Sequence, residues 1–170
     1  SSDVCSSDLK NNIALAAKYI SYKVLKSGEE FSFNEIVGKR SEERGFSSAK
    51  VIENGKFTEG VGGGVCQVSS TVYASALSAG LKITERRNHS LLVGYTEPSF
   101  DAMVSSASDL KFVNPYPVPV IIVVDADGCR VRARVYGKKT GAVYKLASEV
   151  TEYIEPPEEQ IIETYDLLCG

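Results

Sequence analysis

The sequence predicts an α+β domain in which a mostly antiparallel sheet packs with two main helices. Apolar and small residues fall at helical spacing in residues 13–20 and 67–79. Most of the remaining apolar residues lie in short runs of strand-like composition. Two turn sequences, one at residues 53–56 that contains Asn-Gly and one at residues 125–128, join such runs into hairpins. Hairpins pair strands in antiparallel fashion, and we therefore expect little parallel pairing.

The composition excludes several classes of function. The chain has 170 residues, enough for one domain with a real core, and a formal net charge of −3. The sequence contains no basic stripe with interleaved aromatic residues, and a nucleic-acid partner is therefore not expected. No apolar run approaches the roughly 18 residues of a membrane span, and no secretory segment is present in this sequence.

In the first half of the chain, Asn11 or Asn12 is predicted to cap a helix that runs to Ile20. Short strands are expected at residues 24–25 and 31–33, and a charged loop at residues 38–45. Residues 49–52 and 57–58 are predicted to form the first hairpin.

In the second half, strands are predicted at residues 81–84, 100–104 and 111–113. Residues 118–124 form a β-branched run that predicts a buried strand, which pairs with residues 129–136. Three arginines alternate with apolar residues in that last strand and are expected to face solvent: Arg130, Arg132 and Arg134. Residues 144–154 are predicted to add an edge strand.

The chain is organised around a glycine-rich segment, residues 60–64, that leads into Cys66 at the start of the second helix. Unpaired N–H groups and the helix dipole at this end favour an anion, and helix N-termini can lower the pKa of a thiol. The glycines also let the backbone approach a reacting carbonyl and turn N–H groups towards an oxyanion. We interpret Cys66 as a nucleophile. The alternatives are a buried small hydrophobe and a phosphate cradle, although no Lys follows the glycines as it does in a P-loop.

His89 is the single histidine of the chain and therefore the candidate base for Cys66. The predicted path from the helix through Gly80 and the strand at residues 81–84 leads back towards Cys66. The alternative is a surface or hydrogen-bonded loop histidine.

These motifs resemble the VanW domain family. The resemblance rests chiefly on Gly-Gly-Gly-Val-Cys-Gln at residues 62–67 and Asn-His-Ser at residues 88–90, and it extends over roughly residues 11 to 137. Some members are similar to L,D-transpeptidases, cysteine enzymes that cross-link peptidoglycan stem peptides. The family name also records a link to glycopeptide resistance. Arg87 stands where many members carry other residues, which bears on substrate choice.

A third group should orient the imidazole, and two aspartates within the resembling segments are candidates. Asp101 is preferred because it opens a predicted strand after a turn, and Asp109 is the alternative. Arg40, Arg86 and Arg87 can each bind a substrate carboxylate through a bidentate guanidinium. The residues expected to bind substrate or form the oxyanion hole are Gly63, Gly64, Gln67, Arg87, Asn88 and Ser90.

Three segments are expected along the chain. Residues 1–10 are interpreted as a foreign or disordered leader, residues 11–155 as the catalytic domain, and residues 156–170 as a linker with the start of a C-terminal β domain. Cys5 is therefore not expected to have a function. A disulfide between Cys129 and Cys169 is a minor alternative in an oxidising compartment. Scattered cysteines with one histidine make a poor zinc site, and no metal or other cofactor is predicted.

The predicted function is acyl transfer through a thioester on Cys66, with peptidoglycan stem peptides as partners in an extracytoplasmic setting. Any signal or membrane anchor would lie outside this sequence. One alternative is a wall-binding module in which Cys66 is structural. The other is a cysteine peptidase, in which water resolves the same thioester.

Overall fold

A computed structural model describes residues 5–53 and 56–154, without the side chains of residues 52–57. The elements are α1 Ser7–Ile20, β1 Lys23–Leu25, β2 Glu30–Ser32, α2 Phe33–Val37, the 3-10 helix η1 Glu42–Arg44, β3 Ser48–Glu53, β4 Lys56–Val61, α3 Val65–Ser78, β5 Lys82–Glu85, β6 Lys111–Val113, β7 Val120–Asp127 and β8 Arg130–Tyr136. The strands form three small sheets, in the orders β1-β7-β8, β2-β6-β5 and β3-β4. Every pairing is antiparallel, as predicted.

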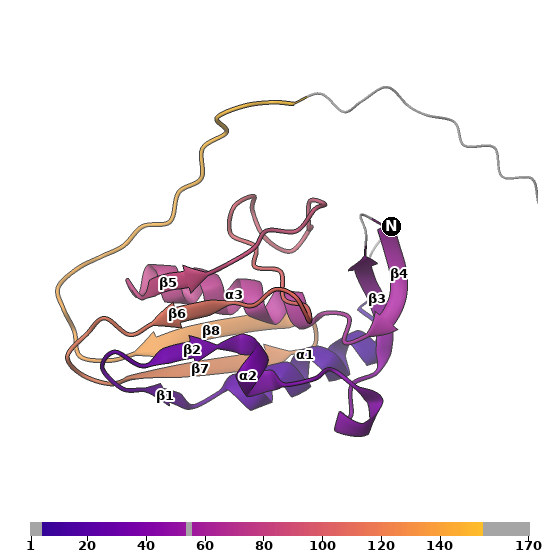
Figure 1. The fold of residues 1–170 in the computed structure, drawn as a ribbon, viewed down its shortest axis with the longest axis horizontal. Helices are drawn as coiled ribbons and strands as arrows, with labels where there is room; N and C mark the ends of the chain where they lie inside the picture. The colour runs from indigo at the N-terminus through magenta and orange to yellow at the C-terminus, as the bar shows by residue number, and fades with distance from the viewer. Residues whose placement is uncertain (1–4, 54–55, 155–170) are drawn as a thin grey trace, which may run out of the picture.

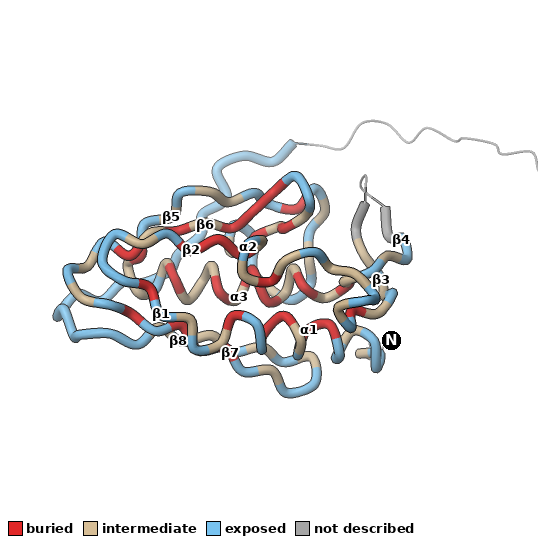
Figure 2. The backbone as a smooth tube through the Cα atoms, turned by 60° about the horizontal axis from the view of Figure 1, so that its bottom comes forward, coloured by how far each residue is buried: buried red, intermediate tan, exposed pale blue. Residues whose placement is uncertain are grey.

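The two long helices build the centre of the molecule. Helix α1 packs against β7 and α3, while α3 contacts both β8 and β5. Figure 2 shows α3 running between the two three-stranded sheets, with buried residues along its length. Phe31 and Phe112, paired across β2 and β6, stack with their ring centroids 4.4 Å apart and close the core on one side. Figure 1 shows β3 and β4 as a separate ribbon at one end.

Helix α1 begins earlier than the sequence predicted. Ser6 accepts a hydrogen bond from the Leu9 amide and caps the helix, five positions before Asn11, the earlier of the two expected caps. Asn12 is instead fully buried, and its side chain bonds the carbonyl groups of Ser47 and Gly63 and the amide of Ser47. The asparagine that suggested a cap thus ties α1 to the chain that enters α3.

The predicted strand at residues 31–33 is partly wrong, because the chain turns into the short helix α2 at Phe33. Ser32 caps this helix, and Asp109 binds its first turn. The predicted loop at residues 38–45 contains the short helix η1.

The predicted strand at residues 100–104 does not form, although Asp101, Ala102 and Val104 are buried. The Ala102 amide bonds the Ser70 hydroxyl and the Met103 amide bonds the Arg87 carbonyl. These partners are not a neighbouring strand, and the segment is therefore extended without belonging to a sheet. Residues 144–154 likewise form no edge strand and are exposed.

Strand β7 is buried on one face, not throughout. Ile122 is fully buried, whereas Ile121 beside it is 39% exposed. In β8 the three arginines face solvent as predicted, and Arg134 pairs with Asp125. No helix within residues 5–53 and 56–154 is long and apolar enough to cross a membrane.

The cysteine pairing differs from the predicted alternative. Cys129 at the β7–β8 turn is joined to Cys5 in a disulfide, and Cys66 is a free thiol. Cys169 lies outside the described residues, as does the predicted segment 156–170.

Candidate active site

Helix α3 begins at the end of the glycine segment and carries Cys66 in its first turn. Gly64, the N-cap residue, has a φ of +91°, and a Cβ there would lie 2.9 Å from Leu9 and 3.0 Å from Ile13. A Cβ on Gly63 would lie 2.6 Å from the Lys50 carbonyl oxygen. These two glycines, predicted to shape an oxyanion hole, thus let α3 start in close contact with α1 and β3.

Cys66 is half-buried, and its Sγ lies 3.5 Å from the Val104 carbonyl oxygen. Among the described residues this is the one hydrogen-bond contact of the Sγ atom, and no hydrogen bond joins Sγ to His89. Burial raises the pKa of the Cys66 thiol, and the nearby charge of Arg40 opposes this effect only in part. The expectation of a lowered thiol pKa is therefore wrong for this state of the protein, because desolvation outweighs the hydrogen bond at Val104 and the charge of Arg40.

His89 is buried and paired with Asp101. Its Nδ1 lies 2.7 Å from Asp101 Oδ2, and the same oxygen accepts a 2.6 Å hydrogen bond from the His89 amide. A carboxylate can only accept, and Nδ1 therefore donates, which leaves Nε2 of the neutral ring as an acceptor. This is the arrangement of a base held by an orienting carboxylate.

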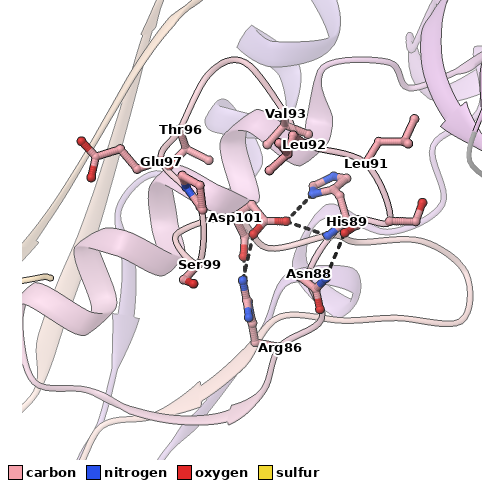
Figure 3. A pocket seen from close by; sticks show the side chains of 12 residues that line it. Arg86, Asn88, His89, Leu91, Leu92, Val93, Thr96, Glu97, Ser99 and Asp101 are labelled. Carbon is pink, nitrogen blue, oxygen red and sulfur yellow. Dashed lines mark hydrogen bonds and ion pairs between the residues drawn. The ribbon is translucent and has the colours of Figure 1, made fainter. Parts of the chain in front are cut away.

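Arg86 completes the Asp101 site (Figure 3). Its Nη2 lies 2.8 Å from Asp101 Oδ1, and its Nε donates to the Asp101 carbonyl oxygen at 2.7 Å. Burial by itself raises the pKa of Asp101, but hydrogen bonds from His89 and the charge of Arg86 lower this pKa on balance. Asp101 therefore stays ionised beside the imidazole, and its carboxylate binds the Arg86 guanidinium.

Asp109, the alternative orienting residue, lies elsewhere. Its carboxylate accepts bonds from the Ser32 hydroxyl at 2.6 Å and from the Asn34 amide at 2.9 Å. These groups form the start of α2, where N–H groups lack partners within the helix. Asp109 thus holds α2 in place and does not contact His89.

Segment 101–104 lies between the His89–Asp101 pair and the Cys66 thiol. On α3, Ser69 donates to the Ala102 carbonyl at 2.6 Å and Ser70 accepts from the Ala102 amide at 2.9 Å. The Cys66 thiol also contacts the Val104 carbonyl. One face of α3 therefore binds this segment along its length. Asp101 at the start of the segment is thereby brought into electrostatic reach of the Cys66 thiol.

Tyr95 also belongs to the site, although the sequence reasoning did not select it. Its hydroxyl lies 3.5 Å from His89 Nε2, and the rings meet edge to face. Burial raises the pKa of this hydroxyl, the charge of a Cys66 thiolate raises it further, and Ser70 acts in the opposite direction, which places Ser70 and Cys66 near Tyr95. Tyr95 lies six residues after the histidine in an irregular loop, where no periodicity or motif indicates a partner.

The remaining residues predicted to bind substrate do not lie together. Gln67 Nε2 donates to the Cys129 carbonyl at 2.6 Å and thus ties α3 to the β7–β8 turn. Asn88 donates to the His89 carbonyl at 2.9 Å, and Ser90 lines the pocket described below. The Arg87 side chain is exposed.

Arg40 is the cation next to Cys66. Its stem packs over Gly62, and its Nη1 donates to Asn34 Oδ1 at 2.8 Å. Burial lowers the pKa of this guanidinium, and the thiol and Asp109 act in the opposite direction. Of the predicted cations, Arg40 lies beside the thiol and Arg86 beside the base.

A pocket of about 400 Å³ opens beside the His89–Asp101 pair (Figure 3). It is formed by the loop that joins them, its lining is a mixture of polar and apolar side chains, and Cys66 is not among its lining residues. The lining residues are Arg86, Asn88, His89, Ser90, Leu91, Leu92, Val93, Thr96, Glu97, Pro98, Ser99 and Asp101. Across the described part of the chain, no three His, Cys, Asp or Glu side chains gather in a way that could hold a metal ion.

Comparison with known proteins supplies the family. The family model described as "VanW like protein" matches residues 9–136. The chain is 43% identical over 128 residues to "Uncharacterized protein YoaR" of Bacillus subtilis, which covers 75% of this chain and 39% of that protein. It is 30% identical over 151 residues to "Vancomycin B-type resistance protein VanW" of Enterococcus faecalis, which covers 84% of this chain and 54% of that protein.

The chain thus spans about two fifths and about half of the lengths of these two relatives. No solved structure gave a significant match. The family match takes in the glycine segment, Cys66, the His89–Asp101 pair and all strands from β1 to β8. By this match and by both relatives, the chain belongs to the VanW family.

Proposed function

We propose that this domain is a cysteine acyltransferase that acts on peptidoglycan stem peptides in an extracytoplasmic setting. The observation that carries the proposal is the His89–Asp101–Arg86 arrangement, held by segment 101–104 against the face of α3 that bears Cys66. One relative is named as a vancomycin B-type resistance protein, and this supports peptidoglycan as the substrate class.

In the proposed reaction, Cys66 Sγ attacks the carbonyl carbon of the third residue of a donor stem peptide. The thiol proton passes to His89 and then to the nitrogen of the terminal D-Ala, whose C–N bond breaks. An amine of a second stem then attacks the thioester, gives its proton to His89, and releases the thiol. Each step conserves the proton, and no cofactor is needed.

The raised pKa of the Cys66 thiol indicates how the first step begins. The resting sulfur is protonated, and a preformed thiolate–imidazolium pair is not the ground state. His89 therefore acts as a general base while the attack occurs. Asp101 stabilises the imidazolium that forms, because it stays ionised next to Arg86.

The test is intact-protein mass spectrometry after incubation with a stem tetrapeptide. The wild-type domain should gain a tripeptide adduct on Cys66 with loss of D-Ala, whereas Cys66→Ala should gain none. Addition of a second stem with a free side-chain amine should yield a cross-linked dimer, because water loses the competition where the amine is held in line. Free tripeptide at saturating acceptor would instead identify a peptidase.

A wall-binding module is the second candidate, and one observation favours it. The pocket beside His89 does not reach Cys66, and the thiol is shielded and protonated. In that case the pocket binds a wall fragment without chemistry. Adduct formation would contradict this alternative, whereas equal binding of wall fragments by the wild type and Cys66→Ala, with no adduct, would establish it.

A further inference from the structure

We propose that the Tyr95 hydroxyl is a catalytic proton relay between the Cys66 thiol and His89 Nε2. The proposal rests on the acyltransferase function above and deepens it, because it assigns the path of the proton in the first step. Four groups carry it: the acceptor nitrogen of His89, the Tyr95 hydroxyl, the Ser70 side chain and the Cys66 sulfur.

The first observation is the position of the hydroxyl at the reactive side of the imidazole. Nδ1 of His89 is occupied by Asp101 at 2.7 Å, and Nε2 is therefore the atom that must receive a proton. Tyr95 places its hydroxyl 3.5 Å from Nε2, with its ring edge-to-face on the imidazole at a centroid distance of 6.3 Å. The site where a thiol would be expected is occupied by this hydroxyl.

The second observation is the relation of the same hydroxyl to α3. Ser70 and Cys66 are four residues apart in the helix and thus lie on one face, one turn from each other. The Ser70 hydroxyl donates to the Cys66 carbonyl oxygen at 2.7 Å, and both Ser70 and Cys66 act electrostatically on the Tyr95 hydroxyl. Tyr95 therefore lies near the turn that carries the thiol.

The third observation is that, in the described part of the chain, no hydrogen bond lets the Cys66 thiol pass its proton directly to His89. Among the described residues no hydrogen bond joins the thiol to the imidazole, and the one hydrogen-bond partner of the thiol is the Val104 carbonyl oxygen at 3.5 Å. A hydroxyl can accept one proton and donate another, which allows it to connect two groups that are not hydrogen-bonded to each other. Desolvation around the Tyr95 hydroxyl raises its pKa, and the group stays neutral at physiological pH, as such a transfer requires.

Two protons move in this step. As Cys66 Sγ bonds to the acyl carbon, the S–H proton moves to the Tyr95 oxygen while the Tyr95 O–H proton moves to His89 Nε2. The products are a tetrahedral intermediate, an unchanged tyrosine and an imidazolium beside Asp101. The reverse transfer delivers the proton to the leaving group, and Tyr95 is neither consumed nor ionised.

The experiment measures acylation of the protein by p-nitrophenyl acetate, followed as the burst of p-nitrophenolate, with the adduct mapped to Cys66 by mass spectrometry. The variants are Tyr95→Phe, His89→Ala and the double variant. Tyr22→Phe is the matched control, because Tyr22 is 73% exposed and outside the site. Thermal unfolding of each variant confirms that the fold is retained, and Phe keeps the ring that packs on His89.

Tyr95→Phe should slow acylation by roughly 10²-fold, the lower end of the range for a positioned proton-transfer group, while Tyr22→Phe leaves the rate unchanged. The double variant should be no slower than His89→Ala, because both residues act in one transfer. In mixtures of H₂O and D₂O, the wild-type rate should follow a curved dependence on deuterium fraction, since two protons move. The Tyr95→Phe rate should lose that curvature, which a merely structural role would not change.

Two results would overturn the relay and leave the acyltransferase standing: Tyr95→Phe within twofold of the wild type while His89→Ala is impaired, or an equal loss from Tyr95→Phe with and without His89. Equal rates for His89→Ala and the wild type, or no adduct on Cys66 in any variant, would instead remove the proposed dyad, and the relay with it.

Discussion

At the scale of single residues, Asp101 and Asp109 show how two buried carboxylates of one chain acquire different roles. Asp101 binds an imidazole and a guanidinium, whereas Asp109 binds a hydroxyl and amides at the start of α2. In the proposed reaction the partners of Asp101 gain from its charge during proton transfer, whereas those of Asp109 only hold a helix. Substitution by the isosteric amide separates these roles, because it removes the charge and keeps the shape.

Asp101→Asn should lower the rate of acylation by roughly 10²–10⁴-fold, because the imidazolium loses its counter-charge and the ring its fixed tautomer. Asp109→Asn should leave that rate within a few fold and lower the unfolding free energy by about 1–3 kcal/mol, the usual cost of an impaired buried hydrogen bond. Burst kinetics and urea unfolding of both variants measure the two effects. The reverse pattern would assign the orienting role to Asp109.

The lowered pKa of Asp101 also predicts how stability depends on pH. A carboxyl group with a lower pKa in the folded state stabilises the protein above its unfolded pKa of about 3.9, and this contribution is lost as pH falls through the folded value. The unfolding free energy of the wild type should therefore fall as pH decreases below about 4. In Asp101→Asn this fall should be shallower. Urea titrations at a series of pH values test it, and parallel curves for the two proteins would contradict it.

At the scale of elements, the start of α3 depends on α1 as much as on its own residues. Asn12 bonds the Gly63 carbonyl at 3.0 Å, and Gly64 passes within contact of Leu9 and Ile13. The glycines that looked like part of an oxyanion hole are required first by packing. Even so, they determine where Cys66 lies, because α3 cannot start in this place with a side chain at Gly64.

Gly64→Ala should destabilise the protein by more than 1 kcal/mol, roughly the penalty of a left-handed conformation for a residue with a Cβ, because contacts with α1 add to that strain. Gly94→Ala is the matched control, since a Cβ there meets nothing within 4 Å. Urea unfolding measures both, and the rate of Cys66 acylation should fall for Gly64→Ala alone. Equal stability of the two variants would show that position 64 tolerates a side chain.

At the scale of the whole molecule, the ordered core ends with β8. Residues 138–154 contain no helix or strand and are exposed, although Tyr144 reaches back towards Gly80 and Tyr116. Every group of the candidate site lies between Arg40 and Val104. The core and the site should therefore not depend on residues 138–154.

A chain shortened after Gly137 should unfold at a temperature within about 4 °C of the full chain, the effect of roughly 1 kcal/mol in a domain of this size. Its rate of Cys66 acylation should be unchanged. Differential scanning calorimetry and the burst assay measure these quantities. A fall of more than about 10 °C would show that Tyr144 and its neighbours form part of the core.

Local sequence was sufficient for features whose cause is local. Helical spacing located α3 and its cysteine, turn residues located both hairpins, and alternation located the exposed face of β8. These predictions succeeded because each pattern reports the conformation of its own few residues. The structure also places His89 Nδ1 2.7 Å from Oδ2 of Asp101, the preferred orienting residue, while the catalytic role of the pair stays a prediction.

Other features were decided by contacts between distant residues. Asn12 was expected to cap a helix and is buried instead, because Ser47 and Gly63 satisfy its amide. The thiol was expected to have a lowered pKa, but burial by the surrounding chain raises it. Tyr95 and segment 101–104 gave no local signal. Spacing along the chain determined which residue types were available, and tertiary packing decided their partners and their desolvation, because both depend on atoms that the local sequence does not contain.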